Sequence, residues 1–156
     1  MTSRREFLAL VGGALAAGSA TAQLDPNIAA KRAAALRTAI SKVTEGKAIR
    51  SGKVKLEVPP LIDNGNTVPL SVTVDSPMSA QDHVKAIHVL TEKNPQPYVV
   101  SAYFGPRAGR AALSTRARIA DTGQVIAIAQ LSDGSFWQDS VSVVVTLSAC
   151  LEDGLI

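Results

Sequence analysis

The feature that most constrains the fold is an alternation of apolar and polar residues that begins at Lys53. In this first segment, Val54, Leu56 and Val58 alternate with charged neighbours, which is typical of a strand with one buried face. Further strand-like segments follow at 68–74, 84–91, 98–104, 111–119, 125–131 and 140–147. Short strands at this near-regular spacing predict an all-β protein.

Turn residues separate these segments. Pro59-Pro60 stops the first strand, and Asp63-Asn64-Gly65-Asn66 is a strong turn signal. The predicted fold is therefore all-β: an immunoglobulin-like β-sandwich of about seven strands, with an N-terminal helix and a mobile C-terminal arm. The Cys…Trp…Cys spacing of antibody domains is absent, so we expect Trp137 to be a core or sheet-face residue.

A helix is predicted ahead of the strands. Asp25 can cap it, Pro26 suits its first position and Gly46 suits its end. Apolar residues recur between them at helical spacing, at Ala29, Ala33, Leu36, Ile40 and Val43. The basic residues fall mainly on the other faces, namely Lys31, Arg32, Arg37 and Lys42. This amphipathic stripe packs either on the domain itself or on a partner protein.

The first residues have the pattern of an export signal. Arg4 and Arg5 are followed by x-Phe-Leu, which resembles the twin-arginine signal, and a short run of small apolar residues comes next. That run is too short to span a bilayer, so we expect no membrane anchor. Ala20-Thr21-Ala22 is a small-x-small cleavage site, which predicts cleavage after Ala22 and a periplasmic protein.

These signals divide the chain into four parts. We expect a signal peptide at 1–22, an amphipathic helix at 23–46, the sandwich at 47–147 and a cysteine-bearing arm at 148–156. Without Arg4, Arg5 and Glu6, the net charge falls from +3 to about +2, which is too weak to predict nucleic-acid binding. Four arginines cluster in sequence without interleaved aromatic residues: Arg107, Arg110, Arg116 and Arg118.

Cys150 is the only cysteine of the chain and follows the last predicted strand closely. A lone thiol in an oxidising compartment is buried, bonded to another molecule or kept free for chemistry. Its small and charged neighbours predict exposure, and a thiol on a mobile end can enter another protein's pocket. We therefore expect a carrier rather than a catalyst, with an arm that presents the thiol through Ser148, Ala149, Leu151, Glu152 and Asp153.

The sequence predicts no metal site, no catalytic residues and no cofactor. Copper sandwiches usually have a His and a Met after the Cys in one loop, and none follows Cys150. Glu152 and Asp153 disfavour the thiolate, because a nearby like charge raises the pKa of a thiol. A thiol enzyme with His88 as its base remains a weaker alternative.

Seven stretches of the chain carry a family resemblance, and one of them is Ser132-Asp133-Gly134-Ser135-Phe136-Trp137. The others lie at 52–59, 63–69, 75–78, 87–89, 92–95 and 114–116. Through these stretches, and from the twin-arginine signal to Cys150, the chain resembles the SoxY sulfur-carrier proteins of periplasmic thiosulfate oxidation.

The resemblance implies an immunoglobulin-like sandwich and a heterodimer with a SoxZ-like subunit that lacks its own signal. It also implies partner sulfur-oxidising enzymes that load, oxidise and release sulfur held covalently on Cys150. The bound sulfur is substrate, so the resemblance implies no further cofactor.

The arm departs from the family pattern. SoxY chains typically end Gly-Gly-Cys-Gly-Gly, whereas this chain has Ser148-Ala149-Cys150-Leu151-Glu152. It is closer to a SoxY-related subgroup whose arm reads Ala-Ala-Cys-Ile-Glu, and its missing glycines stiffen the arm. This difference favours a paralogous sulfur-transfer pathway. The alternative is a non-catalytic binding or scaffold protein, in which Cys150 is incidental or forms an intermolecular disulfide.

Overall fold

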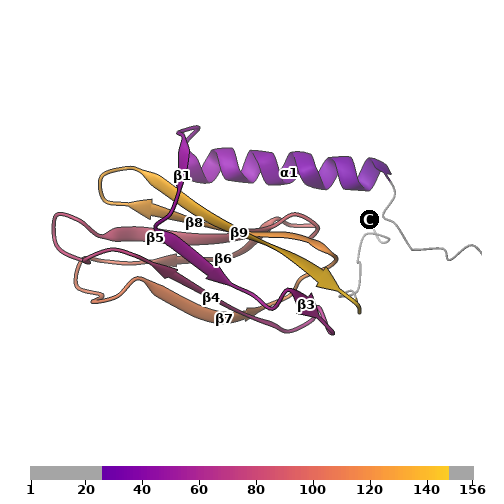
Figure 1. Ribbon diagram of the computed structural model, residues 1–156. Helices are drawn as coiled ribbons and strands as arrows, with labels where there is room; N and C mark the ends of the chain where they lie inside the picture. The colour runs from indigo at the N-terminus through magenta and orange to yellow at the C-terminus, as the bar shows by residue number, and fades with distance from the viewer. Residues whose placement is uncertain (1–25, 148–156) are drawn as a thin grey trace, which may run out of the picture.

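The computed structural model describes residues 26–147, and Figure 1 shows two layers of strands with one helix across them. Helix α1 spans Pro26–Thr44. Nine strands follow: β1 (Ile49–Ser51), β2 (Val54–Glu57), β3 (Leu61–Ile62), β4 (Val68–Val74), β5 (Val84–Thr91), β6 (Tyr98–Tyr103), β7 (Ala112–Ala117), β8 (Gly123–Leu131) and β9 (Phe136–Val145). The protein is therefore mostly β, as the alternating pattern predicts.

The strands form two sheets. The larger has the order β1-β9-β8-β5-β6, with β3 also paired to β9, and the smaller has the order β2-β4-β7. Both β1 and β3 run parallel to β9, at opposite ends of that strand. The chain between them forms β2, so it crosses to the other sheet and back along one edge. There the Leu56 amide donates to Asp139 Oδ2 at 2.8 Å, which joins the two sheets.

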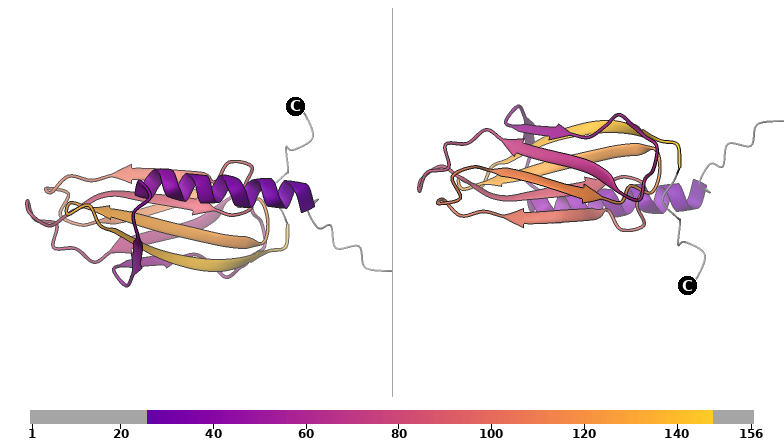
Figure 2. Two further views of the ribbon diagram at one scale, coloured as in Figure 1. Left: turned by 90° about the horizontal axis from the view of Figure 1, so that it is seen from above. Right: turned by 90° about the horizontal axis from the view of Figure 1, so that it is seen from below.

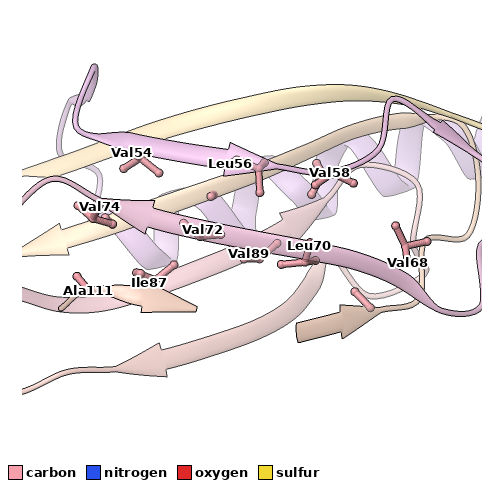
Figure 3. Packing of buried hydrophobic residues seen from close by; sticks show 14 of the residues in the cluster. Val54, Leu56, Val58, Val68, Leu70, Val72, Val74, Ile87, Val89 and Ala111 are labelled. Carbon is pink, nitrogen blue, oxygen red and sulfur yellow. The ribbon is translucent and has the colours of Figure 1, made fainter. Parts of the chain in front are cut away.

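The main core lies between the sheets. Strands β2 and β4 bury every second residue, and Figure 3 shows Val72 and Leu70 beside Val89 of the opposite sheet. In contrast, β5 and β8 are buried on both faces, because α1 covers the outer side of the larger sheet. A second core cluster forms there from Leu36, Ala39, Leu90, Ile126, Ile128 and Phe136. The amphipathic stripe of α1 thus packs on its own domain.

The end of the helix follows the prediction from Gly46. Its φ of +72° is in the left-handed region that glycine adopts readily, and its amide donates to the carbonyl of Ser41 at 3.1 Å. None of the helices within residues 26–147 has the length and apolar character needed to cross a membrane.

The structure differs from the sequence prediction at three places. The prediction that Arg32 lies on an outer face is wrong, because its side chain packs against the 92–97 loop and is only 4% exposed. Strand β9 begins at Phe136 instead of Ser140, because a tight turn at Gly134 returns the chain into the sheet early. Two short strands, β1 and β3, add to the expected seven. The immunoglobulin-like topology stays a prediction.

Candidate functional site: the root of the C-terminal arm

The residues predicted to present sulfur lie outside the described part of the chain. Cys150 belongs to this group, together with Ser148, Ala149, Leu151, Glu152 and Asp153, and so do the signal residues Arg4 and Arg5. The structure instead places the segment that leads directly to them, residues 145–147, which we call the arm root. Its position and attachment define where the cysteine-bearing segment leaves the domain.

Each residue of the arm root is hydrogen bonded through its backbone to a neighbouring segment. The Val145 amide donates to Thr122 Oγ1 at 3.0 Å, and the Thr146 amide donates to the Ile62 carbonyl at 2.9 Å. The Leu147 carbonyl accepts from the Gly65 amide at 3.0 Å. The root is therefore held on one side by the turn before β8 and on the other by β3 and the turn after it.

The turns that hold the root are themselves tied down. Thr146 Oγ1 donates to the Asp63 carbonyl at 3.1 Å, and the Gly65 carbonyl accepts from the Ile119 amide at 2.8 Å. Asn94 connects the loop after β5 to the segment before β8, since its Oδ1 accepts from the Ala120 amide at 2.8 Å. The chain is thus fixed up to Leu147, three residues before Cys150.

The surface around the root is apolar. Leu61 and Val144 are paired neighbours in β3 and β9, with exposed fractions of 60% and 51%, and Leu147 is 67% exposed. These are three of the five large exposed apolar residues within 26–147; the other two are Tyr98 and Tyr103. Exposed apolar side chains gathered in one place mark surfaces that contact other molecules.

The structure does not bring the alternative base, His88, to the arm root. His88 pairs with Ile128, which is five residues along β8 from Gly123, a separation of about 17 Å. Its Nδ1 lies 2.8 Å from Ser101 Oγ, and burial lowers the pKa of its imidazole. Within residues 26–147, no three His, Cys, Asp or Glu side chains gather as a metal site would need.

Two residues of the site were not identified from the sequence as functional. Gly65 was assigned only to the turn at 63–66, and Thr122 falls between the strands predicted at 111–119 and 125–131. Their contacts with the root join segments 23 and 82 residues apart, and no local pattern encodes such pairing. The sequence marks both positions only as turn residues, and it holds no signal that brings them to the end of the last strand.

A comparison with models of protein families shows to which family this chain belongs. The model for "Sulfur oxidation protein SoxY" matches residues 40–150, from the last turns of α1 through the arm root to Cys150. This chain belongs to the SoxY family. The resemblance predicted from the seven sequence stretches is therefore confirmed. No curated protein sequence gives a match.

Two solved structures of other proteins have folds similar to that of this chain. The sulfur carrier protein SoxY from Chlorobium limicola f thiosulfatophilum matches with a TM-score of 0.62 and 24% identity, over 76% of this chain and 97% of that one. A superoxide reductase (neelaredoxin) from Ignicoccus hospitalis matches with a TM-score of 0.56 and 15% identity, over 62% of this chain and 94% of that one. Both likenesses concern the fold alone.

Proposed function

We propose that this SoxY-family protein is a periplasmic sulfur carrier that holds sulfur intermediates covalently on Cys150. It is not an enzyme by itself; partner sulfur-oxidising enzymes load, oxidise and release the sulfur. The observation that carries the proposal is the arm root: the last strand is fixed through Leu147, and the only thiol follows three residues later.

The geometry suits delivery to an enzyme. From a fixed Leu147, an extended chain carries Cys150 about 10 Å away from the domain. The apolar residues Leu61, Val144 and Leu147 surround the point of departure and offer a contact surface for the enzyme. A docked partner would therefore receive the thiol at a defined distance from its own surface.

Export and assembly complete the proposal. Arg4 and Arg5 direct the folded protein to the twin-arginine route, with cleavage after Ala22. A SoxZ-like subunit without its own signal forms a heterodimer with it and is exported at the same time. The non-glycine arm assigns the protein to a SoxY-related pathway with partner enzymes of its own.

The test is the intact mass of the protein purified from its own periplasm during growth on reduced sulfur. We expect masses that exceed the polypeptide by sulfur-containing groups, and their complete loss in Cys150→Ser. A bare thiol under these conditions would contradict the proposal. A stable disulfide to another chain on a non-reducing gel, with sulfur oxidation unchanged in Cys150→Ser, would instead support a scaffold role.

A matched variant tests whether reach matters as well as chemistry. Ser148→Cys combined with Cys150→Ser keeps one thiol but moves it two residues toward the fixed root, which shortens its reach by about 7 Å. We expect this variant to react with small alkylating reagents, yet to carry less sulfur than the natural chain. Equal loading of both proteins would show that the arm length is irrelevant.

A further inference from the structure

A groove lies along the first half of α1, at the end of the molecule where the arm root leaves the sandwich. It has a volume of about 200 Å³ and is lined by Ile28, Lys31, Arg32, Ala35 and Pro95. Its walls combine apolar side chains with one exposed cation, Lys31, whereas the guanidinium of Arg32 is buried and interacts with Asp121. Lys31 is therefore the cation of the groove that an acidic segment can reach.

Direct contacts connect the groove to the arm root. Arg32 Nη1 donates to the Lys93 carbonyl, and the Lys93 side chain lies against Gly123 so closely that a Cβ there would clash. The residue before Gly123, Thr122, accepts from the Val145 amide through its side-chain hydroxyl. Figures 1 and 2 show the same relation, with the start of α1 and the end of β9 at one end of the molecule.

The chain beyond the root has the complementary chemistry. After Cys150 come one apolar residue and two acids, Leu151, Glu152 and Asp153. The acids are five and six residues beyond Leu147, which gives them a reach of about 17–20 Å. An apolar-acidic segment tethered at this distance fits an apolar-cationic groove.

We propose that the groove is the docking site for residues 151–153 of this same chain. In the docked state Leu151 contacts the apolar wall formed by Ile28, Ala35 and Pro95, and the two carboxylates face the exposed Lys31. Cys150 is then held at the edge of its own domain until a partner enzyme displaces the segment. Docking would shield sulfur bound to Cys150 from other reactants. This role rests on the proposed function, because it requires sulfur on Cys150.

Disulfide trapping in a Cys150→Ser background tests the docking. Ala35→Cys, in the groove, is paired with Leu151→Cys, and Lys31 and both acids are kept. Ala34→Cys is the matched control, because it makes the same change one residue away at an exposed position. With diamide as oxidant, we expect the disulfide to form about tenfold faster from position 35 than from position 34.

Charge dependence is the second readout. Lys31→Glu should slow trapping at position 35 about two- to fivefold, and added salt should do the same, since screening weakens exposed charge pairs. Arg37→Glu, on another face of α1, should leave the rate unchanged. Equal trapping at positions 34 and 35, or no response to Lys31→Glu, would overturn the proposal. Because these proteins lack Cys150, the outcome is independent of whether the natural chain carries sulfur.

Discussion

At the scale of single residues, the arm root depends on a small number of side chains that close backbone hydrogen bonds. Thr122 is the clearest of them, because its hydroxyl is the acceptor for the Val145 amide. Val145 is itself buried, so loss of this acceptor removes the hydrogen-bond partner of an amide in a buried residue. A buried backbone donor without a partner costs free energy, and this makes Thr122 a structural determinant of where the arm begins.

Thr122→Val keeps the shape of the side chain and removes only the acceptor. We expect the free energy of unfolding to fall by about 1 kcal/mol, with faster hydrogen exchange at the Val145 amide. Urea denaturation and exchange measured by NMR check the two effects. Thr115→Val is the control, because the Thr115 hydroxyl makes only a long 3.5 Å contact. Equal losses in both variants would contradict a specific role for Thr122.

His88 gives the protein a pH-dependent stability. Burial lowers the pKa of His88 in the folded state, whereas the unfolded chain keeps a pKa of about 6.5. Below that pH the unfolded state binds a proton that the folded state does not, so stability falls as the pH drops from about 6.5 toward the lowered folded value.

His88→Gln should flatten this part of the stability curve, as measured by urea denaturation across the acidic range. His83→Gln is the matched control, since it replaces the other histidine, which lies just before β5. A slope that persists in His88→Gln and disappears in His83→Gln would show that the wrong histidine had been chosen.

At the scale of elements, α1 covers the outer face of the larger sheet. Its apolar stripe covers a face of β5 and β8 that would otherwise expose Leu90, Ile126 and Ile128 to water. Burial of both faces explains why β5 and β8 lack the alternation seen in β2 and β4. The helix therefore converts an apolar sheet face into a second core.

Leu36→Ala tests the contribution of this second core. Leu36 is 8% exposed and packs in the cluster with Phe136, so its truncation leaves a cavity beneath the helix. We expect a loss of about 2–3 kcal/mol, measured by denaturant unfolding, at the lower end of Leu→Ala costs because the site lies near the surface. Arg37→Ala, exposed on another face, should change stability by less than about 0.5 kcal/mol.

At the scale of the whole molecule, the sequence predicted the all-β class, the helix and the order of the long strands. In these elements apolar residues recur with a period of two or 3.6 residues, so a short stretch of sequence is enough to predict them. Strands β1 and β3 were not predicted, because two or three residues carry no period. Their parallel pairing with β9 joins segments more than eighty residues apart, as the 84-residue separation of Thr146 and Ile62 illustrates.

The same limit applies to the site. Cys150 was singled out because it is the only thiol, follows the last predicted strand and has small and charged neighbours. The attachments of residues 145–147 and the inward turn of Arg32 depend on tertiary contacts, which amphipathic spacing does not encode. A basic residue on a mainly polar helix face is normally solvated, and only the 92–97 loop changes that environment.

The proposed export is also tested on the whole chain. Arg4→Lys with Arg5→Lys keeps the charge but removes the paired arginines, so we expect the protein to accumulate in the cytoplasm with its signal uncut. Cell fractionation and the mass of the N-terminal peptide measure this. Glu6→Gln is the control, and we expect it to be exported normally. Undiminished export of the lysine variant would indicate an ordinary secretory route.

The position of β9 between two other strands affects how the domain responds to a pulling force. Near its carboxyl end this strand is bonded to β8 on one side and to β3 on the other. A pull on the arm along the strand axis loads all these bonds together in shear, instead of opening them one after another as in a zipper. If the protein is the carrier that we propose, a partner enzyme can therefore pull on the segment beyond Leu147 without unfolding the domain.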